Sequence, residues 1–124
     1  MHMSDNIDFS VLVGPQVPTR SFKAGETIFN EGEEANELYV IKDGRVGIQA
    51  GNRLLDTLDA KTIFGEMALV DSAPRSAAAI AMTDVTLVPV SEKQFLFLVS
   101  QTPFFALKVM RVLARRLRAS NKSM

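Results

Sequence analysis

The 124-residue chain contains no cysteine and one histidine, at position 2. Without cysteine it can form neither a disulfide nor a thiolate metal site, which is typical of a cytoplasmic protein. A Ser-His-Asp set and a cysteine nucleophile are equally out of reach, and no metal-ligating cluster stands out. The composition therefore favours a binding protein over an enzyme, and we expect no metal ion.

Long apolar runs are also missing. No stretch approaches the ~20 apolar residues of a membrane-spanning helix, so we expect no membrane span, and no signal peptide is evident. Hydrophobic residues still make up 47% of the chain, enough for one compact core. We therefore expect one cytoplasmic domain.

The net charge is zero, but the charges are separated along the chain. Residues 1–101 hold 8 Lys and Arg against 14 Asp and Glu, whereas residues 102–124 hold 6 Lys and Arg and no acid. This asymmetry can mark a surface for nucleic acid or an anionic membrane. The simpler interpretation is a basic helix that packs along its own acidic body or keeps a charged outer face.

Residues 20–91 are predicted to be rich in β-structure, after a loosely ordered lead over residues 1–19. Turn signals recur about every ten residues, and many short strands at regular spacing indicate a sandwich or a barrel. Asp43-Gly44 predicts a tight hairpin, because glycine accepts a positive φ. The predicted strands are Thr27–Phe29, Glu37–Lys42, Arg45–Ala50, Leu54–Leu58, Arg75–Met82 and Val85–Val90.

Residues 92–124 are predicted to be helical. Ser91 and Gln94 form a capping box, and Thr102 with Pro103 marks the start of a second helix. That helix has an apolar face and a basic face. The apolar positions are Ala106, Met110, Leu113 and Leu117, and the basic ones are Lys108, Arg111, Arg115, Arg118 and Lys122.

The most informative segment is 64–77. Gly65 and Glu66 stand where a short helix begins, and Arg75 follows nine residues after Glu66. Amides that open a helix attract an anion, and a guanidinium grips two phosphate oxygens. An ionised Glu66 only accepts hydrogen bonds, so it suits a sugar hydroxyl. These features predict a nucleotide pocket.

This segment resembles the phosphate-binding cassette of cyclic nucleotide-binding domains, found in Crp-like regulators, kinase regulatory subunits and cyclic-nucleotide-gated channels. The family pattern is roughly Phe-Gly-Glu-x-Ala/Gly-Leu, a loop, then Arg-Ser/Thr/Ala-Ala. Residues 22–29 and 38–46 also resemble the family's first hairpin and its next strand and turn, and the resemblance covers about residues 20–121. The matches in the cassette are Phe64, Gly65, Glu66, Ala68, Leu69, Arg75, Ser76 and Ala77.

The resemblance implies a mainly β fold with helices: an antiparallel eight-stranded jelly-roll (double-stranded β-helix) barrel over 20–91, a short cassette helix, and two C-terminal helices over 92–124 in the same domain. It also implies a sensor that binds a cyclic purine mononucleotide and signals by movement of the C-terminal helix. Crp-like activators share Arg-Ser-Ala, which favours cAMP, although Ser76 does not exclude cGMP. The implied binding residues are Phe64, Gly65, Glu66, Met67, Ala68, Arg75, Ser76 and Ala77.

Residues 114–121 resemble the Crp-like hinge-helix region, in which two small hydroxyl residues contact the adenine amino group. Ser120 falls at the first of these places, and Asn121 departs from the pattern at the second, though its amide can read a purine edge. Arg116 is a weaker lid candidate, and a fraying C-terminus is the alternative. Met110, Leu113 and Leu117 offer a homodimer seam.

Only three residues follow Asn121, so we expect no helix-turn-helix in this chain. It is then either a stand-alone sensor that acts on an unidentified protein partner or a fragment of a larger regulator or channel. Two alternatives stay open: a scaffold domain whose pocket binds no nucleotide, and a nucleic-acid or membrane-surface module that acts through the basic helix.

Overall fold

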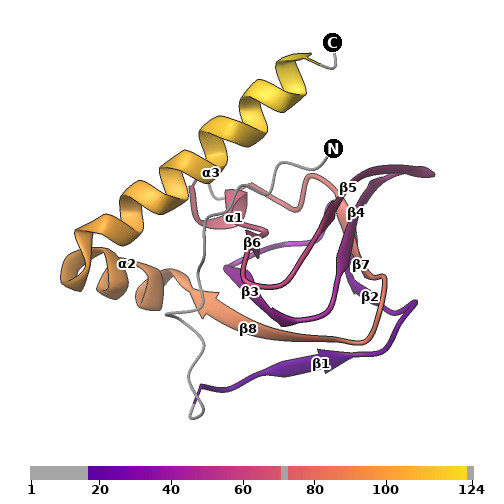
Figure 1. The fold of residues 1–124 in the computed structure, drawn as a ribbon, viewed down its shortest axis with the longest axis horizontal. Helices are drawn as coiled ribbons and strands as arrows, with labels where there is room; N and C mark the ends of the chain where they lie inside the picture. Colours follow the sequence, from indigo (N-terminus) through magenta and orange to yellow (C-terminus); the bar gives the residue numbers. More distant parts are fainter. Residues whose placement is uncertain (1–16, 71–72, 123–124) are drawn as a thin grey trace.

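The computed structural model describes residues 17–70 and 73–122, except for the side chains of Val70 and residues 120–122. The predicted lead over residues 1–19 therefore lies almost wholly outside the described part. Within that part the chain forms eight strands and three helices (Figure 1). In order they are β1 (Arg20–Phe22), β2 (Thr27–Phe29), β3 (Glu37–Asp43), β4 (Val46–Ala50), β5 (Arg53–Leu58), β6 (Ile63–Phe64), α1 (Met67–Val70), β7 (Ala78–Ala81), β8 (Val85–Ser91), α2 (Glu92–Gln101) and α3 (Pro103–Lys122).

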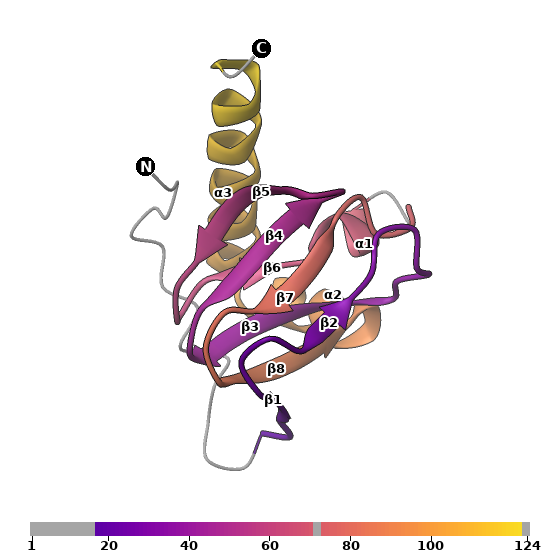
Figure 2. The ribbon, with the colours of Figure 1, turned by 90° about the vertical axis from the view of Figure 1, so that its right-hand side faces the viewer.

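The strands form two four-stranded antiparallel sheets, in the orders β1-β8-β3-β6 and β2-β7-β4-β5. Successive strands from β1 to β4 alternate between the sheets, and Figure 2 shows the two sheets wrapped around one interior. This is the topology of a jelly roll. The predicted fold is thus confirmed: a jelly-roll barrel with a cassette helix and two C-terminal helices.

The hairpin predicted at Asp43-Gly44 is wrong. β3 and β4 belong to different sheets, so the chain crosses between sheets at this turn instead of folding back on itself. Gly44 has φ +97°, and a Cβ there would lie 2.3 Å from the carbonyl oxygen of Asp84. The glycine is needed because the β7–β8 turn approaches so closely. The two-residue hairpin is instead at Gly51-Asn52, where Ala50 pairs with Arg53.

The segment that resembles the family's first hairpin does not form a hairpin either, since β1 pairs with β8 and β2 pairs with β7.

The strand predicted over Arg75–Met82 is shorter than expected and begins at Ala78. Arg75 lies in an extended segment before it, where its N–H donates to the carbonyl of Glu33 and its own carbonyl accepts from Gly32. This pairing holds Arg75 against the β2–β3 loop.

The helix boundaries follow the predicted caps. The Ser91 hydroxyl accepts from the N–H of Gln94, and the Gln94 side chain accepts from the N–H of Ser91, so the capping box is complete. α3 begins at Pro103, as predicted. Within the described residues no single helix is long and apolar enough to cross a bilayer, although α2 and α3 together, bent by 118°, pass on length and composition alone.

Two apolar clusters hold the molecule together. One fills the barrel, and the other lies between the sheet that contains β3 and helices α2 and α3. β3 serves both, because alternate side chains of a strand point to opposite faces: Tyr39 faces the barrel, whereas Leu38 and Val40 face the helices. Phe105, Val109 and Val112 supply the buried face of α3. This packing holds α3 against the sheet that contains β3, and α3 extends past the barrel (Figures 1 and 2).

Candidate functional site

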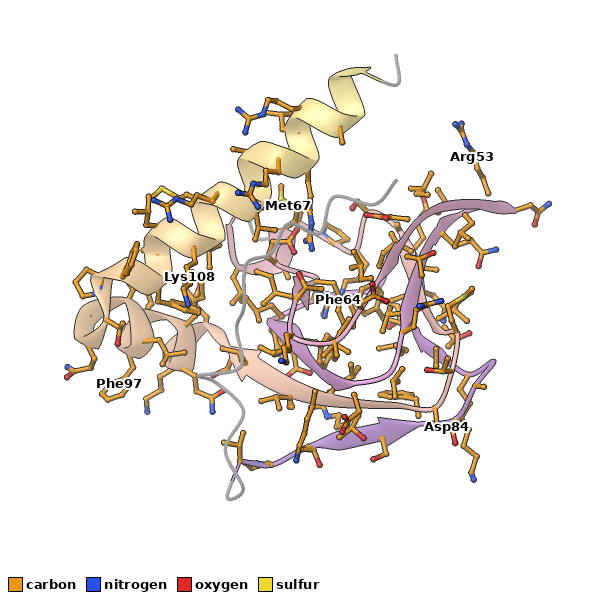
Figure 3. All side chains as sticks on the ribbon, viewed as in Figure 1. Arg53, Phe64, Met67, Asp84, Phe97 and Lys108 are labelled. Carbon is orange, nitrogen blue, oxygen red and sulfur yellow. The ribbon has the colours of Figure 1, made fainter. Side chains whose placement is uncertain are left out.

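A cavity of about 870 Å³ lies between the cassette, β5 and α3. Its volume suits a small-molecule ligand. All eight cassette residues predicted as binding residues line it: Phe64, Gly65, Glu66, Met67, Ala68, Arg75, Ser76 and Ala77. Arg116 from α3 lines it as well, whereas the side chains of Ser120 and Asn121 lie outside the described part of the structure. Figure 3 shows Phe64 inside the barrel and Met67 on the side of the cassette that faces α3.

Arg75 is buried, with 8% of its surface exposed. One terminal nitrogen, Nη1, donates to the carbonyl of Gly65 at 3.0 Å, and the other, Nη2, donates to the carbonyl of Glu37 at 2.9 Å. Burial lowers the pKa of Arg75, and nearby Tyr39 and Glu37 oppose that shift. Arginine has so high an intrinsic pKa that it keeps its charge here. The cavity therefore carries a fixed cation on its wall.

Gly65 allows this placement. Its φ is +76°, and a Cβ on Gly65 would lie 2.7 Å from Nη1 of Arg75. A side chain at this position would have to displace the guanidinium, and its backbone would be strained. The glycine of the cassette is thus required by both backbone conformation and close approach.

Glu66 is 7% exposed. Although it shares the cavity with Arg75, its carboxylate pairs with Arg116 instead. Oε1 of Glu66 accepts from Nη1 of Arg116 at 2.5 Å, and Nη2 of Arg116 donates to the carbonyl of Ile63 at 2.6 Å. Arg116 therefore ties α3 to the start of the cassette. Glu66 is thus linked to the final helix rather than to Arg75.

The periodicity of the final helix is the sequence feature that indicates an inward position for Arg116. It falls four residues after Val112, on the face that also carries Phe105 and Val109 and that packs on the barrel. Periodicity places Arg116 on the inward side of α3, but the sequence does not say which carboxylate it meets.

The cassette helix is short. The N–H of Ala68 donates to the carbonyl of Gly65 at 3.4 Å, and that of Leu69 to the carbonyl of Glu66 at 3.0 Å, which closes one turn. Ala68 is buried, so there is little room for a larger side chain, while Met67 and Ser76 are exposed. The Ser76 hydroxyl is accessible at the cavity wall and can donate or accept a hydrogen bond.

The remaining wall was not predicted from the sequence. β5 contributes Leu54, Leu55 and Asp56, and α3 contributes Leu113 and Leu117. Leu54, Leu55 and Leu117 are more than half exposed. An apolar wall opposite charged groups is what a flat base and an anionic phosphate require of one pocket. Asp56 pairs with Ile48 across the β4–β5 ladder, and its carboxylate accepts from the N–H of Thr57.

A buried arginine, a buried carboxylate and an apolar wall thus line one cavity on a jelly-roll barrel. Residues 19–102 match the family model described as the cyclic nucleotide-binding domain. The chain belongs to the cyclic nucleotide-binding domain family.

Two similar proteins are named as a transcriptional regulator and an activator protein. The chain is 32% identical over 114 residues to the CRP-like cAMP-activated global transcriptional regulator of Mycobacterium tuberculosis, covering 88% of this chain and 51% of the relative. The crystal structure of Thermus thermophilus Catabolite Activator Protein superposes with a TM-score of 0.80 at 28% identity, covering 93% of this chain and 60% of that one. The chain thus spans about half the length of the curated relative.

A third similar protein is the EAL enzyme Bd1971. Its cAMP-bound form is 36% identical with a TM-score of 0.64, covering 85% of this chain and 30% of that one. Its cGMP-bound form has the same identity and a TM-score of 0.65, covering 86% and 30%.

Proposed function

We propose that this cyclic nucleotide-binding regulatory domain binds cAMP in preference to cGMP and signals through α3. The observation that carries the proposal is one cavity that holds both a buried, charged Arg75 and a buried Glu66 tied to α3. The preference for cAMP is supported by the cAMP-activated relative and by the Arg-Ser-Ala sequence. The domain acts as a sensor for an unidentified protein partner and carries out no chemistry itself.

Each group of the ligand has a counterpart in the cavity. The singly charged cyclic phosphate meets Arg75 and the amides that open α1. The ribose 2′-hydroxyl donates to Glu66, because an ionised carboxylate accepts only. The purine lies against the apolar wall formed by Leu54, Leu55 and Leu117. The Ser76 hydroxyl adds a hydrogen bond to the phosphate or to the base.

The link from ligand to α3 runs through Glu66. Arg116 already holds this carboxylate, so a ligand that binds Glu66 changes the contact that seats α3. Coupling of this kind is reciprocal: the arrangement of α3 that favours the ligand is also the one that the ligand stabilises. The size of the response is limited by the difference in affinity between the two arrangements.

α3 also offers a seam for a second copy, but not the one expected. Leu113 packs against the chain's own core, so it is removed from the predicted seam of Met110, Leu113 and Leu117. The exposed positions Leu107, Met110, Ala114 and Leu117 recur at intervals of 3, 4 and 3 residues. A 3-4 repeat of apolar residues on an exposed helix face is typical of a coiled coil. We propose a homodimer along this stripe.

Calorimetric titration with cAMP, cGMP and AMP tests the binding. We expect micromolar or tighter binding of cAMP, weaker binding of cGMP, and still weaker binding of AMP. Arg75→Ala should weaken cAMP binding by about 30-fold or more, since removal of one partner of a buried charged contact costs about 2–5 kcal/mol.

The matched control is Arg45→Ala, since Arg45 is exposed and pairs with Asp59 outside the cavity. Equal heats for the native chain and Arg75→Ala would contradict the assignment of Arg75. Salt-sensitive binding of DNA or anionic lipid, independent of nucleotide, would instead support the surface module.

A further inference from the structure

Arg75 lies over two aromatic rings, Phe29 and Tyr39, which pack against a third, Phe64; we name the three rings the aromatic cradle. They come from β2, β3 and β6, strands that belong to both sheets. Ring centroids are 5.9 Å apart for Phe29 and Phe64, 5.3 Å for Tyr39 and Phe64, and 6.2 Å for Phe29 and Tyr39. All three rings are buried in the barrel core. The cradle is therefore a rigid part of the fold.

The guanidinium of Arg75 lies over this cradle. Its central carbon is 4.1 Å from the ring centroid of Phe29 and 5.6 Å from that of Tyr39. Its terminal nitrogens meanwhile donate to the carbonyls of Gly65 and Glu37. The two rings contact the flat face of the guanidinium, and the two carbonyls accept hydrogen bonds from its edge. A planar group held in both directions has one orientation.

The cradle holds the guanidinium without neutralising it. The side-chain hydrogen bonds of Arg75 go to two neutral carbonyls, in contrast to Arg116, which donates to a carboxylate. A guanidinium paired to a carboxylate would have to exchange that partner for a ligand phosphate. Arg75 keeps its full positive charge, and two of its five N–H donors are used by the carbonyls. A preorganised cation with no direct ion pair among the described residues is well suited to bind a phosphodiester.

Tyr39 is itself held in place. Its hydroxyl donates to the carboxylate of Glu37 at 2.9 Å and accepts from Arg20 at 3.1 Å. Arg20 also pairs with Glu37 at 2.5 Å. The ring of Tyr39 is thus fixed at its polar end by charged groups and at its flat face by Phe64.

We propose that Phe29 and Tyr39 are positioning residues for the ligand phosphate, acting through the guanidinium of Arg75. The inference rests on the proposed function, because it assigns these rings a part in the same site. Phe29 makes the closer contact with the guanidinium, so it should contribute more to positioning Arg75 than Tyr39 does. Without the guanidinium, these rings would contribute only to the packing of the barrel core.

The test is a titration of cAMP against Phe29→Leu, with Phe22→Leu as the matched control. Phe22 packs against the same barrel core from β1, but it does not line the cavity. The cation–π contact is lost with the ring, so Phe29→Leu should weaken cAMP binding by about 10-fold. Phe22→Leu should leave the affinity within about 2-fold of native, and Phe29→Tyr, which keeps the ring, should do the same.

A double-mutant cycle separates positioning from packing. In an Arg75→Ala background no cation remains for the ring to orient, so Phe29→Leu should change the cAMP affinity by less than about 2-fold. If Phe29→Leu weakens binding equally in both backgrounds, or leaves native binding unchanged, the proposal is overturned and the proposed function stands. If the native chain binds no cyclic nucleotide, the proposed function itself fails.

A second measurement needs no ligand and no change to the core. In a nitrogen-15 spectrum of the native chain, the side-chain N–H of Arg75, identified by its loss in Arg75→Lys, should be shifted upfield by the ring of Phe29. The N–H of exposed Arg118 provides the reference. A resonance of Arg75 at the same position as that of Arg118 would overturn the proposal.

Discussion

Replacement of Arg116 by methionine should destabilise the fold through Glu66. Arg116 bridges the Glu66 carboxylate and the Ile63 carbonyl, 50 and 53 residues away in the chain. The exposed fractions of the two charged side chains are 22% and 9%. Methionine keeps the length and helix propensity of the side chain but removes all donors. Glu66 is then left as a buried carboxylate without this partner.

The magnitude follows from that burial. Removal of one partner from a buried ion pair costs about 3–5 kcal/mol, and the residual exposure of Arg116 lets water recover part of it. We expect a loss of about 3 kcal/mol in the free energy of unfolding. For a domain of this length the corresponding fall in Tm is about 10 °C.

Urea unfolding followed by circular dichroism measures the loss. Arg118→Met is the matched control, because Arg118 is exposed on the same helix and its replacement should change stability by less than about 0.5 kcal/mol. Glu66→Gln should reduce the penalty of Arg116→Met, since a neutral amide is less costly to leave buried than a charge. Equal stabilities of Arg116→Met and Arg118→Met would refute the reasoning, because the contact would then contribute nothing measurable.

Three further predictions follow from single positions. Lys61 has φ +77°, which costs a residue with a side chain about 1 kcal/mol, so Lys61→Gly should raise the free energy of unfolding in urea by about that amount. Gly65→Ala should weaken cAMP binding in calorimetry by at least about 10-fold, because the new Cβ displaces Nη1 of Arg75 and a charged contact to the phosphate is lost. Burial raises the pKa of Tyr39 in the folded protein above its ordinary value of 10.0. The contribution of the protonated Tyr39 to the free energy of unfolding is therefore complete below about pH 10 and is lost as the pH rises through the folded-state pKa. Native protein should therefore lose stability more steeply than Tyr39→Phe above about pH 10 in unfolding titrations, and parallel curves would contradict this.

The cassette could be predicted from the sequence because its contacts are local. Gly65 and Glu66 adjoin α1, and Arg75 returns to them across a short gap, so residue types and spacing carry the information. The eight cassette residues predicted from the sequence to bind the ligand all line one cavity. The capping box at Ser91 was predicted for the same reason. Short-range patterns of strands and turns indicated only a sandwich or a barrel, and the jelly roll was implied by the family resemblance.

The contacts that complete the site depend on strand order and helix placement, which short-range patterns do not contain. Asp43-Gly44 has the composition of a hairpin, but the same glycine serves a crossing between sheets. Arg116 reaches Glu66 only because α3 packs beside the cassette. The aromatic cradle joins Tyr39 and Phe64, which pair across β3 and β6, to Phe29 from β2 in the other sheet.

The most direct test of the account is a crystal structure of the native chain grown with saturating cAMP. We expect phosphate oxygens within about 3 Å of the Arg75 guanidinium and the ribose 2′-hydroxyl at the same distance from the Glu66 carboxylate. A cyclic phosphate bound elsewhere, with Arg75 still bonded only to the carbonyls of Gly65 and Glu37, would contradict it.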